Sequence, residues 1–356
     1  MTVAPVERAD LRVRVGRALS AFLTGQRHRL AAIDADLVPV ADALDAFVLG
    51  GGKRLRPAFA FWGYRGAGGA DADTVVATLS ALELLHASAL IHDDVMDSSD
   101  TRRGEPAVHR RFAAIHSAAG WYGDPAVFGS AAAVLLGDLC LVWSDEMLHS
   151  GGLDPVTLAR ARPVFDAMRT EVIAGQHLDM LAQSTGDTSL ARASKVARYK
   201  AAKYTVERPL LLGAAIADAS KDLRDAYSAY GLPLGEAFQL RDDVLGVFGD
   251  PAHTGKPAGD DLREGKRTYL VAAAFERAAH DDRRTLEHRL GDPALDDAGV
   301  AELRDIITRT EALARTEGRI AELTADALAA LSSVDIEAEA AAALADLAAA
   351  ATRRAG

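Results

Sequence analysis

Carboxylate and guanidinium groups crowd together in the stretch HDDVMDSSDTRRG, directly after an apolar run. On a helix, positions i and i+4 share a face, so Asp93 and Asp97 project to one side and Asp94 lies about 100° around the axis. Arg102 and Arg103 follow at once. Carboxylates at the end of a buried helix must be protonated, paired or metal-bound, because an unpaired buried charge is very costly.

A second acidic cluster has the same form. In GEAFQLRDDVLGVFGD, Asp242 and Asp243 end another largely apolar stretch, and Gln239 lies one turn before Asp242. The segment GKPAGDDLREGKRT comes soon after and carries a further set of charged residues: Lys256, Asp260, Asp261 and Lys266.

These oxygen ligands, without histidine or thiolate partners, suit a hard cation such as Mg²⁺. Mg²⁺ keeps several waters and is bridged by one or two carboxylates to substrate phosphates. Either cluster alone is equally consistent with a solvated acidic helix end. Two clusters of the same form, each followed by basic residues, favour a site for magnesium and a diphosphate.

Two basic segments supply candidate phosphate ligands. LGGGKRLRP places Lys53, Arg54 and Arg56 after three glycines; it is not a Walker A loop, because its spacing differs, but a glycine turn entering a helix can bind a phosphate. ARYKAAKYT places Lys200 and Lys203 on one helix. Solvated surface charge is the alternative for both segments, and Arg102 and Arg103 could instead pair with Asp97 or Asp100.

The elements that must position these residues are predicted to be helices almost throughout. Alanine and leucine dominate, and period-2 patterns are scarce. Glycine-rich joints separate the periodic segments, and no long linker divides the chain, so we expect one all-helical domain over residues 1–356. The expected helices span residues 8–24, 31–47, 55–67, 73–98, 126–150, 155–184, 190–218, 221–248, 268–280, 298–316, 319–332 and 335–353.

Composition narrows the class of protein. The 356 residues are 49% hydrophobic and carry a net charge of −11, which argues against bulk binding to nucleic acid. Cys140 is the only cysteine, which excludes a disulfide framework within one chain. The N-terminal segment has no signal-peptide core, and we expect no membrane span, so a cytoplasmic protein is predicted.

The motifs read in order as GGKRLRP, HxxxLIHDDVMDxSDTRRG, K-A-A, FQLRDDVLG and GKPxGDDLxEGK. This set resembles the trans-isoprenyl diphosphate synthases (polyprenyl synthetases), and the likeness runs from about residue 30 to residue 330. The resemblance implies an isoprenoid-synthase-type fold: a large all-α bundle of long antiparallel helices around a central cavity, usually in a homodimer. It implies condensation of isopentenyl diphosphate with an allylic diphosphate, with three Mg²⁺ ions held by two facing aspartate motifs.

The resemblance also implies roles for single residues. Asp93 and Asp97 correspond to first-motif metal ligands supported by Asp94, and Asp242 to the main ligand of the second motif, with Asp243 and Asp261 nearby. The residues that correspond to the binding sites of the two diphosphates are Arg102, Lys200 and Lys256 for the allylic diphosphate and Lys53, Arg56, His86 and Arg103 for isopentenyl diphosphate. We place Gln239 and Lys266 with the substrate-binding residues, and Gln176 and Asp179 match a family segment that lines the cavity.

Two positions depart from the family's commonest pattern. Gly246 replaces the third aspartate of the second motif, and Ala201 follows Lys200 where threonine is usual. Neither change removes a charge that the proposed chemistry needs.

Product length in the family depends on side-chain bulk before the first aspartate motif. Ser88 and Ala89, the fifth and fourth residues before Asp93, are both small. We therefore expect a product longer than farnesyl, namely geranylgeranyl diphosphate. Leu85, Leu82 or residues on a facing helix such as FGSAAAVLLGDL would form the cavity floor. A longer polyprenyl product is the alternative.

Three rival interpretations stay open at this point. A class I terpene cyclase would share the first aspartate cluster but needs a different second motif. A di-iron bundle protein would use the two Glu-x-x-His pairs, Glu83–His86 and Glu146–His149, but leaves both aspartate clusters unexplained. A non-catalytic partner subunit would be expected to lose the aspartate clusters, and this chain keeps both.

Overall fold

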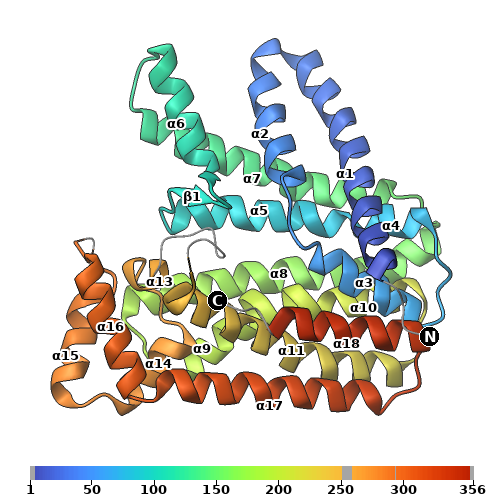
Figure 1. Ribbon diagram of the computed structural model, residues 1–356. Helices are drawn as coiled ribbons and strands as arrows, with labels where there is room; N and C mark the ends of the chain where they lie inside the picture. Colours follow the sequence, from blue (N-terminus) through green and yellow to red (C-terminus); the bar gives the residue numbers. More distant parts are fainter. Residues whose placement is uncertain (1–4, 251–258, 293, 353–356) are drawn as a thin grey trace. The chain divides into compact units, whose positions relative to one another are not determined.

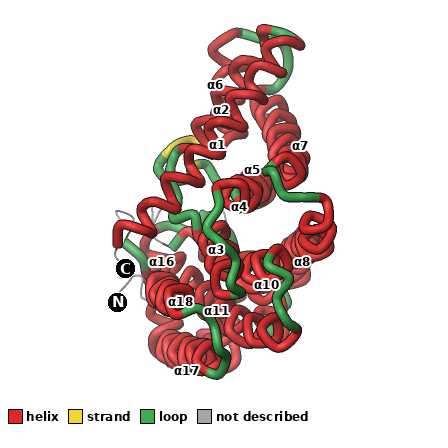
Figure 2. The backbone as a smooth tube through the Cα atoms, turned by 90° about the vertical axis from the view of Figure 1, so that its right-hand side faces the viewer, coloured by secondary structure: helices red, strands yellow, loops and turns green. Residues whose placement is uncertain are grey.

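Helices make up nearly all of the regular structure of this chain (Figure 1). The computed structural model describes residues 5–250, 259–292 and 294–352. Within these ranges the β-structure is one two-stranded antiparallel ladder that pairs Thr101 with Pro106 and Arg102 with Glu105 (Figure 2). The prediction of an all-α fold is confirmed.

The chain divides into two compact units, which we describe separately. Unit 1 comprises residues 1–61 and 69–159, and unit 2 comprises residues 62–68 and 160–356. The first aspartate motif therefore belongs to unit 1 and the second to unit 2. The single domain over residues 1–356 stays a prediction.

Unit 1 holds the N-terminal helices and the short hairpin. Its elements are α1 (Pro5–Ile33), η1 (Ala35–Leu37), α2 (Val38–Leu49), the first part of α3 (Leu55–Gly66), α4 (Asp73–Leu79), α5 (Ala81–Met96), β1 (Thr101–Arg102), β2 (Glu105–Pro106), α6 (Val108–Ala119) and α7 (Pro125–Ser150).

Helix α5 is the central positioning element of unit 1. It packs along α7, and α6 packs on α7 as well. Leu82, Leu84 and Ile91 on α5 are fully buried, and Gly137 on α7 allows close approach, because a Cβ atom there would lie 2.1 Å from His92 Nε2. The apolar run in front of the first aspartate motif is thus anchored in the core, and the motif itself stands at the helix end.

Unit 2 contains most of the remaining helices. Its elements are the end of α3, α8 (Pro155–Thr185, whose first turn lies in unit 1), α9 (Leu190–Val196), the π-helical segment η2 (Ala197–Glu207), α10 (Arg208–Ile216), α11 (Lys221–Phe248), α13 (Asp260–Arg263), α14 (Tyr269–Arg277), α15 (His280–Arg289), α16 (Asp297–Arg309), α17 (Ala312–Ser332) and α18 (Ala338–Thr352).

Helix α11 has the corresponding central place in unit 2, packed against α17, η2 and α18. Two fully buried tyrosines on α11 hold their hydroxyl groups in hydrogen bonds: Tyr227 donates to Gly63 O at 3.1 Å and Tyr230 to Leu344 O at 2.7 Å. The C-terminal end of α11 packs into an apolar cluster that includes Val247 and Leu262. The second aspartate motif is therefore placed by a helix whose other face is buried.

The structure differs from the predicted helix ranges in several places. Helix α6 and the hairpin before it were not predicted, nor was α15. The expected helix over 73–98 breaks at Ser80, and the one over 298–316 ends at Arg309 because Glu311 adopts a left-handed backbone with φ +59°. Local capping and turn geometry determine where these helices begin and end, and the spacing of apolar residues along the sequence does not predict these boundaries.

By length and composition alone, two helical stretches are candidates to cross a membrane. They are Asp73–Met96 and Pro125–Ser150, whose most apolar windows are 72% and 33% buried within the fold. Burial is typical of a core helix, and two stretches of this kind are weak support for a span.

Candidate active site

The first aspartate motif separates its carboxylates into two environments. Asp94 is fully buried and accepts hydrogen bonds from Arg102, through Nε at 2.9 Å and through a terminal nitrogen. Asp93 and Asp97 are partly exposed at the end of α5, and Asp93 Oδ2 lies 3.8 Å from Arg102. The helical spacing predicts this separation of Asp94 from Asp93 and Asp97.

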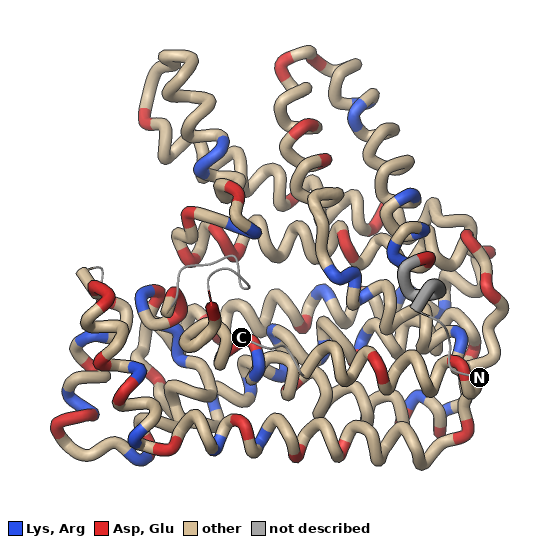
Figure 3. Tube along the Cα trace, viewed as in Figure 1, with Lys and Arg blue, Asp and Glu red and all other residues tan. Residues whose placement is uncertain are grey.

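The hairpin explains the position of Arg102. Its two residue pairs turn the chain back just after α5, so that the guanidinium reaches Asp94. Acidic and basic residues meet where α5 ends and the hairpin begins (Figure 3). Arg102 forms an ion pair with Asp94, and Asp100 pairs with Arg110 at 2.6 Å.

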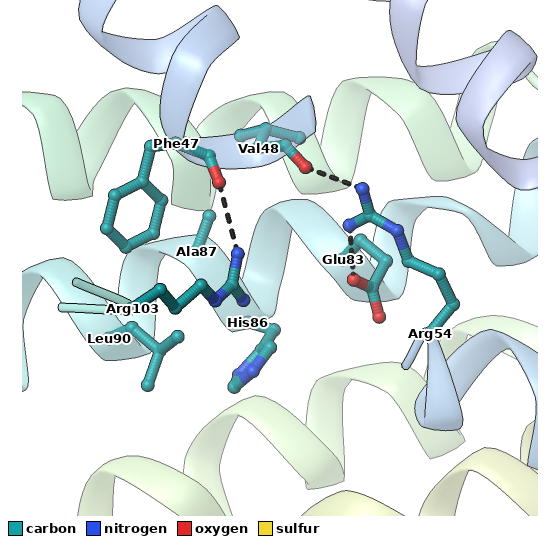
Figure 4. A pocket seen from close by; sticks show the side chains of 8 residues that line it. All are labelled: Phe47, Val48, Arg54, Glu83, His86, Ala87, Leu90 and Arg103. Carbon is teal, nitrogen blue, oxygen red and sulfur yellow. Dashed lines mark hydrogen bonds and ion pairs between the residues drawn. The ribbon is translucent and has the colours of Figure 1, made fainter. Parts of the chain in front are cut away.

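A small pocket in unit 1 is lined by residues from the end of α2, the loop after it, α5 and the turn of the hairpin (Figure 4). It has about 190 Å³ of empty space, part of it open to solvent. The residues that line it are Phe47, Val48, Arg54, Glu83, His86, Ala87, Leu90 and Arg103.

Two arginines of this pocket sit on unusual backbone. Arg54 and Arg103 have φ values of +51° and +56°, a left-handed conformation that non-glycine residues rarely adopt. Gly51 and Gly52, at φ +112° and +114°, form the preceding turn, and a Cβ atom on Gly52 would lie 3.5 Å from the Arg103 guanidinium. The 3.5 Å contact is an ordinary van der Waals distance, so it is the positive φ of the turn that favours glycine here. The Arg103 guanidinium donates to Gly51 O of this turn at 3.3 Å.

The sequence did not identify Arg54 and Glu83 as lining this pocket. Arg54 is buried and donates to Glu83 Oε2 at 2.6 Å and to Val48 O at 2.7 Å. The triplet GGG before Lys53 predicts a tight turn, but it does not indicate that Arg54 is buried while Lys53 stays exposed. The pair is structural, and it orients the wall of the pocket.

Of the residues predicted to bind isopentenyl diphosphate, His86 and Arg103 line this pocket, whereas Lys53 and Arg56 are not among its lining residues. His86 is half-buried on α5, and burial, together with the positive charges of Arg56, Arg103 and Arg102, holds the pKa of His86 well below its usual value of 6.5. Its imidazole is therefore neutral at physiological pH. Arg56 is half-buried and Lys53 is exposed.

The second aspartate motif also combines a buried carboxylate, Asp243, with a partly exposed one, Asp242. Burial raises the pKa of Asp243 to about 8; a hydrogen bond from Gln239 opposes this, and the charges of Asp261 and Asp242 add to it. The Gln239 amide donates to Asp243 Oδ1 at 2.8 Å. A bound cation would favour the ionised carboxylate.

Lys200 and Lys266 both have carboxylate partners in unit 2. Lys200 Nζ lies 2.6 Å from Asp179 Oδ2, and Lys266 Nζ lies 2.5 Å from Glu264 and 3.6 Å from Asp261. Lys200 stands in the π-helical segment, a feature frequent at functional sites. Lys256 lies outside the described residues.

The donor set fits magnesium as a diphosphate-bridged ion. Within residues 5–250, 259–292 and 294–352, no three His, Cys, Asp or Glu side chains are grouped closely enough to form a metal cage. Mg²⁺ needs no such cage, because one or two carboxylates, water and substrate phosphates complete its coordination. Asp93, Asp97 and Asp242 offer such oxygens at partly exposed helix ends.

The hydrogen-bond partners of Glu83 and Glu146 argue against the di-iron interpretation. Glu83 is engaged by Arg54, and Glu146 accepts hydrogen bonds from Gln26 at 3.0 Å and Arg29 at 2.5 Å. Both glutamates of the two Glu-x-x-His pairs are thus held by cationic or amide side chains rather than turned toward a shared metal.

A profile of the polyprenyl synthetase family matches residues 39–307. The chain belongs to this family. It is 33% identical to a geranylfarnesyl diphosphate synthase from Aeropyrum pernix, over 81% of this chain and 86% of that protein. It is 37% identical to a (2E,6E)-farnesyl diphosphate synthase from Mycobacterium bovis, over 62% of this chain and 56% of that protein.

Among solved polyprenyl synthetase structures, the chain is similar to a geranylgeranyl pyrophosphate synthase from Corynebacterium glutamicum, complexed with isoprenyl diphosphate and magnesium. The TM-score is 0.93 and the identity 45%, covering 96% of this chain and 98% of that one. A short-chain trans-prenyltransferase activity follows from family membership, and neither the terpene cyclase nor the di-iron alternative is favoured.

Proposed function

We propose that this protein condenses isopentenyl diphosphate with an allylic diphosphate in a magnesium-dependent reaction and forms geranylgeranyl diphosphate. The observation that carries the proposal is the first aspartate motif, in which Arg102 holds Asp94 buried while Asp93 and Asp97 stay accessible on one helix face. In such an arrangement one carboxylate has a structural role, and the other two can coordinate a hard cation.

In unit 1, Asp93 and Asp97 hold magnesium, and Arg102 contacts the allylic diphosphate beside them. Isopentenyl diphosphate binds at the arginine-lined pocket through Arg56 and Arg103. Bidentate guanidinium groups suit phosphate oxygens.

His86 in this pocket and Lys53 outside its lining are the remaining residues of the proposed isopentenyl diphosphate site. Neutral His86 donates or accepts one hydrogen bond without adding charge, and Lys53 adds a mobile cation at the edge.

In unit 2, Asp242 is the main magnesium ligand, and Asp243 supports it. Lys200 binds the allylic diphosphate after exchanging its Asp179 partner for phosphate oxygens. Gln239, Lys256 and Lys266 assist in binding the substrate.

The chemistry needs no side-chain nucleophile. Magnesium, when bound, supplies Lewis-acid stabilisation of the negative charge on the departing pyrophosphate. Arg102 and Lys200 each add positive charge to diphosphate oxygens, where charge develops in the transition state. The allylic cation is then attacked by the isopentenyl double bond, and the resulting tertiary cation loses a proton to the pyrophosphate, which gives an elongated allylic diphosphate.

Small side chains before Asp93 favour the geranylgeranyl product. Ser88 is buried, Ala89 is half-buried, and Leu85 and Leu82 are buried deeper along α5. A phenyl ring at 88 or 89 would fill space that the growing chain needs. The named relatives form products that differ in length, which makes direct sizing of the product necessary.

We propose further that three Mg²⁺ ions bind and that the chain acts as a cytoplasmic homodimer. Apolar side chains recur on the exposed surface of α7, which supports a second copy as the occupant of this face: Val127, Phe128, Val134, Leu135 and Val142. Light scattering coupled to size-exclusion chromatography should give a molar mass of twice that of one chain for the wild type. Leu135→Glu should lower this mass to that of a single chain. A wild-type protein with the mass of one chain would contradict the dimer.

The test of the proposed function is a product assay. The protein is incubated with Mg²⁺, labelled isopentenyl diphosphate and dimethylallyl, geranyl or farnesyl diphosphate, and the dephosphorylated products are sized by chromatography. A magnesium-dependent twenty-carbon alcohol is expected. Longer products would overturn the proposed chain length, and folded protein that incorporates no label with any primer would overturn the activity.

A further inference from the structure

The π-helical segment η2, which carries Lys200, is contacted by a row of residues on α8. Glu171, Gly175 and Asp179 lie four residues apart on that helix and therefore share one face. Asp179 pairs with Lys200, and a Cβ atom on Gly175 would lie 2.3 Å from Lys200 N. The third member of the row, Glu171, has its partners at the other end of the same segment.

Glu171 accepts hydrogen bonds from two cationic side chains. Arg208, the first residue of α10, donates from Nε to Oε2 at 2.7 Å and from Nη2 to Oε1 at 2.6 Å, and Lys203 Nζ donates to Oε1 at 2.9 Å. Burial would raise the pKa of Glu171, but these hydrogen bonds lower it below its ordinary value, so the carboxylate is ionised at physiological pH. Lys203 Nζ also lies 3.4 Å from Glu207 Oε2, which completes a network of four charged residues.

The two cations can share one carboxylate because the backbone between them is π-helical. The backbone N–H of Arg208 donates to Lys203 O, five residues back, which is the hydrogen bond of a π-helix. Residues five apart on an α-helix lie about 140° apart around the axis and point to different sides. One π-helical turn brings such residues back to the same side, so the shared carboxylate matches the π-helical form of this segment.

The direction of Lys200 depends on this form of the backbone. A change from five-residue to four-residue hydrogen bonding shifts the register by one residue, which turns the side chains on one side of the change by about 100° around the axis. Lys200 stands three residues before Lys203 in the same segment. Whatever holds the π-helical turn therefore also holds Lys200.

We propose that Glu171 is a positioning residue, which keeps Ala197–Glu207 π-helical by binding Lys203 and Arg208 together and so directs Lys200 toward the allylic diphosphate. Glu171 itself touches neither substrate nor magnesium. This inference rests on the proposed function, since it concerns the diphosphate that Lys200 binds.

The first experiment measures binding without turnover. The dissociation constant of inorganic pyrophosphate is determined by calorimetry at saturating Mg²⁺ for Glu171→Gln, Lys200→Met and the double variant, after retained helical circular dichroism is confirmed. We expect Lys200→Met to raise the constant about tenfold and Glu171→Gln to raise it about fivefold. The double variant should equal Lys200→Met within about twofold, because Glu171 acts only through Lys200.

Steady-state kinetics supply a second readout. Glu171→Gln should raise KM for the allylic diphosphate about fivefold and leave KM for isopentenyl diphosphate at its wild-type value, because Lys200 serves only the allylic diphosphate. A general loss of stability would not separate the two substrates.

The bidentate contact of Arg208 can be tested by degree. Arg208→Met should match Glu171→Gln in its dissociation constant for pyrophosphate. Arg208→Lys keeps the charge but not the bidentate contact, so its constant should lie between those of Arg208→Met and the wild type.

Glu339→Gln is the matched control. Glu339 on α18 accepts a hydrogen bond from Arg65 of α3 at 3.0 Å, so this variant also removes a partly buried carboxylate from an ion pair of unit 2. Its dissociation constant for pyrophosphate and both KM values should equal those of the wild type.

The outcomes separate this inference from the proposed function. Glu171→Gln with wild-type affinity for pyrophosphate would overturn the role of Glu171 even if the enzyme elongates prenyl chains normally. A double variant whose constant is raised by the product of the two single effects would do the same. Failure of elongation, with the binding pattern as expected, would leave Glu171 in its role and overturn only the assigned reaction.

Discussion

At the scale of single residues, charged side chains in this protein divide between structure and chemistry. Asp94 and Arg54 are buried and paired, whereas Asp93, Asp97 and Arg56 stay accessible. Helical spacing alone separates Asp93 and Asp97 from Asp94, so that division could be predicted. Nothing in the residue types separates Arg54 from its neighbour Arg56, because that difference comes from the left-handed backbone at Arg54.

Removal of Arg54 should destabilise the fold strongly. Arg54→Met leaves the Glu83 carboxylate buried without its cation, which costs about 3–5 kcal/mol when a buried pair is broken. Arg29→Met, which breaks the more exposed pair with Glu146, should cost about 1 kcal/mol or less. Urea unfolding of both variants measures the two losses, and equal losses would contradict the structural role of Arg54.

The buried position of His86 should make stability depend on pH. Its folded pKa is depressed, so the unfolded chain binds a proton that the folded chain resists. The contribution of neutral His86 to the free energy of unfolding is therefore fully present above the ordinary pKa of 6.5. It decreases as the pH drops below 6.5, by up to about 1.4 kcal/mol per pH unit. His86→Gln should show a shallower fall between pH 6.5 and 5 in urea unfolding. His280→Gln, at an exposed position, should keep the wild-type slope; a His86→Gln slope as steep as wild type would refute the assignment.

At the scale of elements, the helices could be predicted wherever a long apolar face exists. Helix α7 begins at Pro125 and ends at Ser150, within one residue of expectation. The short hairpin could not be predicted, since two residues per strand leave no alternating pattern. The π-helical segment could not be predicted either. It lies within the helix expected over 190–218, and its residue types do not distinguish a π-helix from an α-helix, because packing against neighbouring helices determines its backbone.

Glycines on the neighbouring helices give the π-helical segment its room. A Cβ atom on Gly175 of α8 would lie 2.3 Å from Lys200 N, and one on Gly235 of α11 would lie 2.5 Å from Ala202 Cα. Both contacts are with backbone, which cannot rotate away. The two helices therefore fix the segment that carries Lys200.

Alanine at either glycine should destabilise the protein despite its better helix propensity. We expect Gly175→Ala and Gly235→Ala to lower the free energy of unfolding by about 1–3 kcal/mol through overpacking. At Gly318 of α17 a Cβ atom meets nothing within 4 Å, so Gly318→Ala should raise the free energy of unfolding by up to about 1 kcal/mol. Urea unfolding gives the sign directly, and a gain for Gly175→Ala similar to that for Gly318→Ala would show that the close packing is not a constraint.

At the scale of the whole molecule, each of the two compact units contains one aspartate motif. The order of motifs along the chain was sufficient to identify the family, because several short patterns recur in a fixed sequence. Side-chain partners were not predictable in the same way: Asp94–Arg102, Lys200–Asp179 and Glu171–Arg208 depend on turns and on the π-helical segment between the motifs. The central claim is that both motifs serve one magnesium-dependent reaction.

The most direct test is the initial rate of isopentenyl incorporation in Asp93→Ala and Asp242→Ala across a magnesium titration. Asp100→Ala and Asp225→Ala, at exposed positions in unit 1 and on α11, are the matched controls. We expect no incorporation when Mg²⁺ is chelated, a loss of about 100-fold or more in each motif variant with helical circular dichroism retained, and near-normal rates in both controls. Near-normal turnover in either motif variant, or turnover independent of magnesium, would contradict the account.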